Sequence, residues 1–487
     1  MPGRMEIQLD SGRPRKRETD GDGSPFAILA LAPWRGSASA PGRLDTRPAI
    51  RLDVESFDNA FARMAPRVVI EGYGEGGANH VLEPKSLDDL HPDALLRDVP
   101  ALRSLVSLLT VARDPKTFRE IVPTTRPQGP APVAENDAAT LSRLLGRAPE
   151  GGTVMAGAAE SAVDRLVREA VAPYIVAGPD PRQAEVVVGV ETAIGAALRV
   201  VLRQPALQAL EARWRSLRRL VFGVESDGPV RLYALDVSRD EWTADLAARR
   251  DGPPLALRRA IEAAIAKEGL PGFPLIVLEA TFEETVEDAA ALTGWGALAA
   301  ASGSSLIARA GPSLVGATVA ADLDDPTRWK RLEGRPAESW SALRRGPLAA
   351  GVALTLPRVL ARPPYGALTD PIETLPFEEV SDDPDDTGFL WSGATWSCAE
   401  LIAAAAAAGH TTPLSAVGTI EDLPFAIFTT GGGRKIRGGT EVLLPDRAAE
   451  ALLDVGLVPA VADPSANALR IPRLQSIADP PRALGDR

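Results

Sequence analysis

The sequence of 487 residues contains a single cysteine, Cys398, and only three histidines. One cysteine excludes disulfides within the chain and zinc sites built from several thiolates. The histidines His80, His91 and His410 leave little material for a histidine-based metal site or a catalytic triad. Cys398 and His410 are separated by an alanine-rich stretch that favours helix, which places them roughly 18 Å apart at 1.5 Å per residue. We therefore predict a buried structural thiol, no catalytic residue, no metal and no cofactor.

The chain also lacks an excess of positive charge and a long apolar run. The formal net charge is −12, which argues against nucleic-acid binding because that needs a basic face. The longest apolar run, residues 401–409, is about half the length that spans a bilayer. The first residues lack the apolar segment of a secretory signal. These features predict a cytoplasmic protein without membrane insertion.

Two loops invite a ligand-binding interpretation. The glycine-rich stretch TTGGGRKIRGGTE, residues 429–441, lacks the spacing and the Lys–Ser/Thr ending of a phosphate-binding loop. We interpret it as a hairpin tip between strands at 423–430 and 440–446, and an enzyme holding a phosphate-bearing ligand there is the alternative. The acidic stretch SDDPDDTG, residues 381–388, lacks the glycine and distal glutamate of an EF-hand loop and is interpreted as a surface loop.

The stretch RQPALQALEARWRSLRRLV, residues 203–221, has the clearest helical pattern. Its apolar residues recur at spacings of three and four, at Leu207, Leu210, Trp214, Leu217 and Val221. Four arginines lie mostly on the other side, at Arg213, Arg215, Arg218 and Arg219. Glu211 and Arg215 form a favourable i,i+4 pair. We expect Trp214 to pack the helix on its neighbours and the arginine face to be solvated or used in subunit contacts.

The rest of the chain alternates short apolar runs with helical stretches, which is typical of an α/β sheet with flanking helices. Near the N-terminus we expect a strand in 24–34, a strand–helix–strand unit in 47–72 and two helical pieces in 86–114 divided at Pro100. A short strand is expected in 4–12, and helices are expected at 136–147, about 158–171 and about 183–203. After residue 230 we expect strands at 230–238, 273–282, 304–311, 351–360, 423–430, 440–446 and 457–463, and helices at 240–250, 286–303, 398–409 and 447–456.

The four prolines of residues 122–135 mark the best domain boundary. The predicted organisation is a mixed α/β fold: a small αβ domain precedes a helical region and an α/β core sheet with flanking helices. The predicted segments are 1–121 for the small domain, 122–135 for the linker, 136–228 for the helical region, 229–480 for the core and 481–487 for a tail.

Several ordered blocks resemble the large subunit of the type VI secretion contractile sheath. They include LRQPALQALEARWRSLRRLV, DVSRDEWTADL, GFPLIVLEATFEE, WSALRRGPLAAGVALTLPRVLARPPYG, FLWSGATWSCAELIAAAAAAG and TEVLLPDRAAEALLDVGLVPAV. The run from Arg358 through Arg362 to Tyr365, followed by Phe389 to Trp391, is the most specific part. Before the proline linker, SPFAILALAPWRG, VESFDNAFARMAPRV and KSLDDLHPDALLRDVPALRSLVSLLTVARD resemble the small sheath subunit.

The resemblance implies a small subunit fused to a C-terminally shortened large subunit of a structural, non-enzymatic protein. Such a protomer polymerises helically around an inner tube protein and contracts to propel it. The implied partners are copies of itself or other sheath subunits, the inner tube protein, an AAA+ recycling ATPase and baseplate components. A sheath-like cap, a baseplate adaptor or an assembly regulator that does not polymerise is the alternative. As interface candidates we select Trp214, Arg215, Arg219, Arg358, Arg362, Tyr365 and Trp391.

Overall fold

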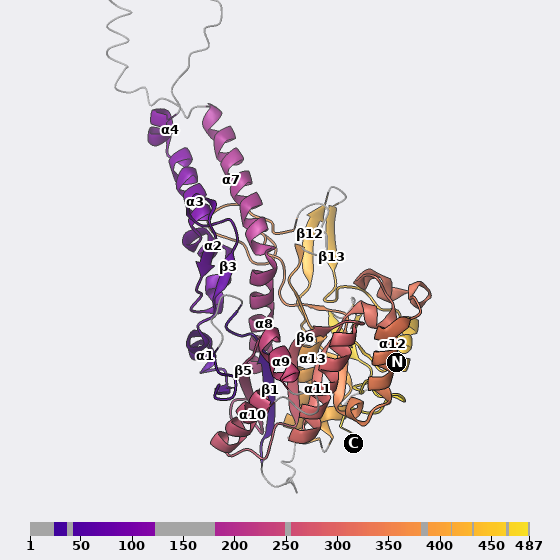
Figure 1. The fold of residues 1–487 in the computed structure, drawn as a ribbon. Coiled ribbons are helices and arrows are strands. Elements are labelled where there is room, and N and C mark those ends of the chain that lie inside the picture. Colours follow the sequence, from indigo (N-terminus) through magenta and orange to yellow (C-terminus); the bar gives the residue numbers. More distant parts are fainter. Residues whose placement is uncertain are drawn as a thin grey trace, which may run out of the picture. The chain divides into compact units, whose positions relative to one another are not determined.

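The computed structural model of the chain describes residues 24–36, 42–121, 181–248, 255–380, 388–410, 412–430, 433–463 and 467–485. They form two compact units (Figure 1). The larger unit contains the described residues up to Arg103 and from Gly195 onward, and the smaller unit contains those between Ser104 and Ile194. All seven interface candidates lie in the larger unit.

Among the described residues, the larger unit is built on a seven-stranded sheet with the order β14-β8-β7-β6-β1-β5-β2. The strands are β1 (Phe26–Ala32), β2 (Ile50–Leu52), β5 (Val230–Asp236), β6 (Leu275–Phe282), β7 (Ser305–Ala310), β8 (Val352–Leu356) and β14 (Val458–Pro459). Neighbouring strands are parallel, and only β2 runs antiparallel to β5. Parallel strands covered on both faces need continuous apolar sequence, and all five residues of β8 are buried.

Strand β1 is an interior strand of this sheet, between β6 and β5. It pairs with β5 along its whole length, from Phe26↔Val230 to Ala32↔Asp236. On its other edge, Ile28 to Leu31 pair with Leu275 to Leu278 of β6. A strand from the predicted small domain therefore shares one sheet with strands from the predicted core, while the domain boundaries themselves stay a prediction.

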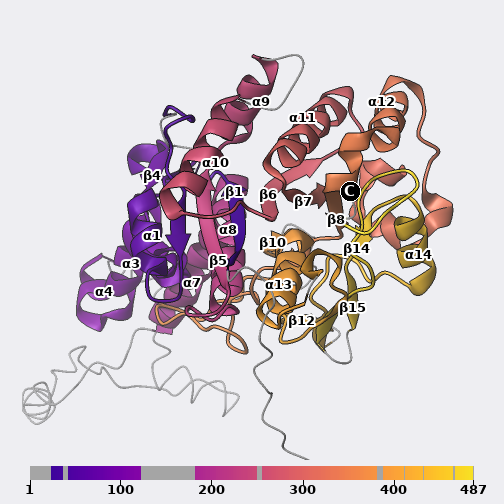
Figure 2. The same ribbon diagram turned by 90° about the horizontal axis from the view of Figure 1, so that it is seen from below.

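Helices cover both faces of the sheet (Figure 2). One face carries α9 (Arg239–Ala247), α10 (Leu255–Glu268), α11 (Val286–Ser302) and α12 (Gly334–Arg345). The other face carries α13 (Ala394–Ala407), and α8 (Pro205–Phe222) packs beside it. On the first face, Trp242, Trp295 and Leu298 join strand residues such as Leu278 in one buried apolar cluster. The predicted mixed α/β fold with flanking helices is confirmed.

The rest of the larger unit consists of smaller sheets and short helices. Two-stranded sheets pair β3 (Val68–Ile70) with β4 (His80–Leu82), β9 (Val359–Leu360) with β10 (Trp391–Ser392), and β12 (Ala426–Thr430) with β13 (Gly433–Arg437). A further sheet has the order β11 (Gly418–Ile420), β16 (Ala468–Ile471) and β15 (Val461–Asp463). The remaining helices are α1 (Phe57–Met64), α2 (Pro92–Asp98) and α14 (Asp446–Asp454), with 3-10 turns η1 (Glu75–Gly77), η2 (Leu87–Leu90), η4 (Pro312–Val315), η5 (Ala320–Asp324), η6 (Pro326–Arg328), η7 (Pro347–Gly351) and η9 (Pro413–Ser415).

Parts of three helices, α3 (Pro100–Arg113), α4 (Pro115–Ile121) and α7 (Pro181–Leu202), make up the smaller unit. Within it, the Gln183 amide donates to the carbonyl oxygens of Ala112 and Arg113 at 2.9 and 3.1 Å. Arg113 also pairs with Glu191 at 2.8 Å. These contacts hold the end of α3 against the start of α7.

Most predicted elements are confirmed, and a few are wrong. Residues 440–446 form no strand, because Thr440 makes only an isolated bridge to Val359 and Pro445 already caps α14. The strand that pairs with β12 is instead 433–437, so most of the glycine-rich stretch is a strand and not a tip. The strand expected in 4–12, the linker 122–135, the helices expected at 136–147 and 158–171, and residues 381–387 lie outside the described residues. None of the described helices has the length and apolar content that crossing a membrane requires.

Candidate functional site

Helix α8 packs through the predicted apolar stripe. Leu207, Leu210, Trp214, Leu217 and Val221 are all buried. The Trp214 ring lies 5.2 Å from Trp34, 5.8 Å from Phe57 and 4.5 Å from Phe61, measured between ring centroids. Its indole N–H donates to the Trp34 carbonyl oxygen at 3.0 Å. Trp214 is thus a core anchor that ties α8 to the end of β1 and to α1.

The arginine side of α8 is bound largely within the chain. Arg213 donates to the Pro33 carbonyl oxygen, and the Arg218 guanidinium lies 4.4 Å from the centre of the Phe222 ring. Arg215 donates through Nε to Glu211 Oε1 at 2.7 Å, which is the predicted i,i+4 pair. Glu211 itself is 1% exposed. A carboxylate buried on this helix requires further positive charge.

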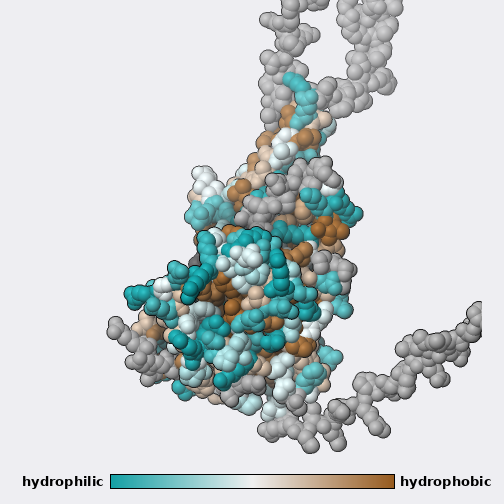
Figure 3. All heavy atoms as spheres, turned by 90° about the vertical axis from the view of Figure 1, so that its right-hand side faces the viewer, coloured by the Kyte–Doolittle hydropathy of each residue, from teal (hydrophilic) through white to brown (hydrophobic). Residues whose placement is uncertain are grey.

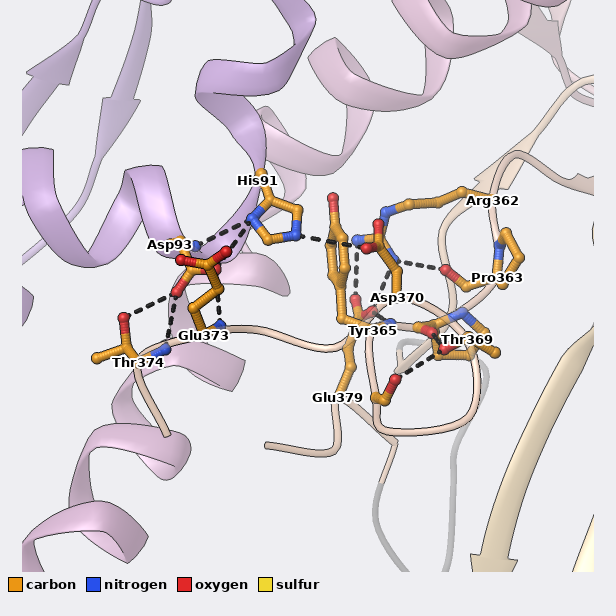
Figure 4. Close-up of polar contacts among 12 residues, drawn as sticks. His91, Asp93, Arg362, Pro363, Tyr365, Thr369, Asp370, Glu373, Thr374 and Glu379 are labelled. Carbon is orange, nitrogen blue, oxygen red and sulfur yellow. Dashed lines mark hydrogen bonds and ion pairs between the residues drawn. The ribbon is translucent and has the colours of Figure 1, made fainter. Parts of the chain in front are cut away.

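That charge comes from Arg362, which lies between the buried carboxylates of Glu211 and Glu379. Figure 4 shows Arg362 beside Glu379 and Tyr365. Its Nε donates to Glu211 Oε1 at 2.7 Å, and its Nη1 donates to Glu379 Oε2 at 2.6 Å. The guanidinium also lies 3.8 Å from the centre of the Tyr365 ring. The Tyr365 hydroxyl accepts from Arg215 Nη2 at 2.8 Å and donates to Glu211 at 3.3 Å. We call Glu211, Arg215, Arg362, Tyr365 and Glu379 the α8 ion network.

Mutual pairing determines the protonation of this network. Burial disfavours the charged form of Glu211, but Arg362 and Arg215 more than offset it and lower its pKa to about 2. Burial likewise opposes the charge on Arg362, yet Glu211 and Glu379 raise its pKa well above the ordinary value. Burial and the Glu211 carboxylate raise the pKa of Tyr365. Glu211, Arg215 and Arg362 are therefore ionised at neutral pH and Tyr365 is neutral, so none of these four groups is poised for proton transfer.

A second set of contacts joins the loop after Tyr365 to the start of α2 (Figure 4). The His91 ring lies edge-on to Tyr365, with 5.0 Å between ring centroids. The Asp93 carboxylate accepts from the backbone N–H groups of Glu373 and Thr374 at 3.0 and 3.2 Å. Three segments distant in sequence, at 91–93, 211–215 and 362–379, thus meet at one place.

The other interface candidates form two ion pairs nearby. Arg219 of α8 donates to both oxygens of Glu400 on α13, at 2.9 and 3.2 Å, and to two backbone carbonyl oxygens of the 421–422 turn. Arg358 pairs with Glu441 at 2.5 Å, and its guanidinium lies 5.9 Å from the centre of the Trp391 ring. Trp391 belongs to a small buried cluster with Phe389 and Phe428. The structure thus brings Arg215, Arg362 and Tyr365 together and places Arg358 beside Trp391, while Trp214 and Arg219 take part in separate contacts.

The described residues offer little for catalysis. Cys398 is fully buried in α13, and burial raises the pKa of its thiol to about 12, so the reactive thiolate is suppressed. His410 follows the opposite end of that helix. No group of three or more His, Cys, Asp or Glu side chains in the described part of the chain is arranged to hold a metal ion.

The sequence of the segment that contains this network matches a known family. The model of the EvpB/VC_A0108 tail sheath N-terminal domain, VipB, matches residues 184–477, which is more than half of the chain. The chain belongs to the VipB tail sheath family. The matched segment contains every interface candidate together with Glu211 and Glu379. The α8 ion network is thus a feature of the VipB-type part of this chain.

One curated relative supports the same assignment. The type VI secretion system sheath protein TssC1 of Pseudomonas aeruginosa is 26% identical over 314 residues. The alignment covers 62% of this chain and 63% of that protein. The chain therefore spans less than two thirds of the relative's length.

Sequence reasoning missed the two buried carboxylates of the network. Glu211 follows Leu210 and precedes Ala212 on a helix rich in charge, so it resembles a surface residue. Its burial depends on Arg362, which is 151 residues away. The signal that could have indicated these carboxylates is the run from Arg358 to Tyr365, the most specific part of the resemblance to the large sheath subunit.

The low pKa of Glu211 predicts a dependence of stability on acid. Since the pKa falls from 4.5 to about 2 on folding, the ionised carboxylate stabilises the folded state by about 3 kcal/mol above pH 4.5, and this is lost as the pH falls toward 2. We expect Glu211→Gln to lack this contribution. The free energy of unfolding, measured with urea, should change less between pH 5 and pH 3 for the variant than for the wild type. Equal changes in the two proteins would contradict the low pKa of Glu211.

Proposed function

We propose that this chain is a structural protomer of a type VI secretion contractile sheath. It polymerises helically around an inner tube and contracts to propel that tube outward. The observation that carries the proposal is the VipB family match over residues 184–477. Non-closing head-to-tail contacts between identical protomers generate helical filaments, and contraction requires two stable packings of one lattice.

The ion pairs that hold α8 in place support this role. A protomer that transmits force has to keep its helices and sheet in register while the lattice rearranges. The α8 ion network and the Arg219–Glu400 pair fix α8 against α13 and against the segment 358–392. Buried ion pairs of this kind are specific in geometry even where their net stabilisation is small. We propose that the seven interface candidates act mainly by holding this framework in the shape that neighbouring protomers recognise.

We further propose that the chain fuses a small and a large sheath subunit through residues 122–135. The position of β1 supports this idea, because the small-subunit-like segment fills the gap between β5 and β6. Fusion raises the effective concentration of the two parts to about millimolar and fixes their ratio at one to one. The proposed partners are other copies or other sheath subunits, the inner tube protein, an AAA+ recycling ATPase and baseplate components. The proposed setting is the cytoplasm, and the proposed protomer is non-enzymatic and binds neither cofactor nor nucleic acid.

Electron microscopy of the purified full chain tests the proposal. We expect tubules or helical filaments, alone or with separately produced sheath subunits and inner tube protein. Particles that stay monomeric under all of these conditions would refute the polymerising sheath. A chain that binds only the ends of preformed sheaths would instead identify the cap or adaptor role. A thermal-shift screen with nucleotides is the matched control for the enzyme alternative, since a ligand that binds the folded state raises the melting temperature.

A further inference from the structure

The β12–β13 hairpin presents one covered and one uncovered face. Figure 1 shows it extending away from the central sheet, and in the described part of the chain its strands pair only with each other. On the covered face, Phe428 lies 6.0 Å from Phe389 between ring centroids, and the Arg437 guanidinium lies 4.7 Å from the centre of the Phe389 ring. Leu360 N–H donates to the Gly439 carbonyl oxygen at the base of the hairpin. The hairpin is therefore anchored, and its outward geometry is fixed.

The uncovered face is apolar and basic. Ile427 and Ile436 lie directly opposite each other in the pairing, so they share this face, and Ile436 is 71% exposed. Arg434 lies two residues before Ile436 on β13 and so points to the same face; it is exposed and has no ion pair within the described residues. The segment from Leu423 to Thr440 contains no acidic residue, although the chain as a whole has a net charge of −12. A projecting apolar face that carries a cation, on a protein of net negative charge, suits association with another acidic copy.

A groove of about 950 Å³ lies between α9 and α11, on the other side of the central sheet from the hairpin (Figure 2). It is lined by Trp242, Leu246 and Leu348, by alanines and Gly294 of α11, and by the charged residues Arg239, Glu287 and Asp288. Glu287 is exposed at the groove, and Asp288 is already bound to Arg239. Figure 3 views the molecule from the side of α12. Most of this face is hydrophilic or neutral, with small apolar areas. Within the described chain, the groove thus combines apolar walls with one available carboxylate.

We infer that the hairpin of one copy docks its Ile427–Ile436 face in the α9–α11 groove of a second copy, with Arg434 facing Glu287. The inference rests on the proposed sheath function and names one of its contacts. Because the hairpin and the groove lie on opposite sides of the sheet, each copy keeps a free hairpin and a free groove at its two ends. The contact is therefore head-to-tail and propagates instead of closing into a dimer.

A charge exchange in the full chain tests this contact. We expect R434E to lower the fraction that pellets on ultracentrifugation at least tenfold, because like charges then meet at Glu287. Adding E287R to that variant is expected to restore pelleting to within threefold of the wild type. R335E, which reverses an exposed arginine of α12, is the matched control and should assemble like the wild type.

The apolar part of the contact has its own variant. Ile436→Ser removes an exposed side chain, so we expect an unchanged melting temperature by circular dichroism and at least a tenfold fall in pelleting. Assembly of R434E at the wild-type level, or failure of E287R to rescue it, overturns the docking and leaves the sheath proposal intact. A wild-type chain that never assembles overturns both.

Discussion

Replacing Arg362 by methionine is expected to lower the free energy of unfolding by about 3–5 kcal/mol, because breaking a buried ion pair leaves an uncompensated charge. Arg362 is 5% exposed and is shared by two carboxylates that are themselves buried. Without it, Glu211 retains Arg215, whereas Glu379 keeps the backbone N–H of Tyr365, which donates to its Oε2 at 2.8 Å. Methionine preserves much of the volume, so the loss measures the missing charge and not a cavity.

Urea unfolding followed by circular dichroism at pH 7 measures this loss. Arg335→Met on α12 is the matched control, since Arg335 is exposed and such substitutions change stability by about 0.5 kcal/mol or less. The deficit of the Arg362 variant should shrink at low pH, because protonation neutralises the stranded carboxylates. If the Arg362 variant loses less than about 1 kcal/mol of unfolding free energy, the α8 ion network does not stabilise the fold.

Helices and strands that carry a clear local pattern could be predicted from the sequence. The stripe from Leu207 to Val221 has helical spacing, and the apolar runs of β1 and β5 to β8 have the continuity that buried parallel strands need. Elements with weaker local signals were missed. Helix α12 buries only Trp340 and Leu343, so it lacks an apolar stripe.

Sequence patterns could not predict features that depend on pairing between residues far apart in the chain. The run 440–446 is as apolar as a strand, but at Thr440 it meets only the two-residue strand β9 and then ends at Pro445. The arginine side of α8 was expected to be solvated or used in subunit contacts because arginine is rarely buried. In the structure, Glu400 and the 421–422 carbonyl oxygens bind Arg219, and nothing in the helix itself indicates these partners.

Replacing Trp214 by alanine is expected to cost about 3–5 kcal/mol, the range for removing a buried aromatic side chain. The ring is fully buried against three aromatic neighbours, and its N–H satisfies the Trp34 carbonyl oxygen. Trp214→Phe retains much of the packing and loses the hydrogen bond, so we expect a loss of about 1–2 kcal/mol for this control. Equal effects of the two variants would show that ring packing does not anchor α8.

The double variant R362M/W214A determines whether α8 acts as one structural unit. Glu211 and Trp214 lie less than one turn apart on the helix, and they hold it from two sides. If α8 detaches once either anchor is lost, the second substitution costs less than it does alone, and the coupling energy should be about 0.5–3 kcal/mol. Strictly additive losses in urea unfolding would mean that the aromatic cluster and the α8 ion network stabilise the fold independently. A coupled α8 is the arrangement that a force-bearing protomer requires, because displacement at one anchor is then resisted by the other.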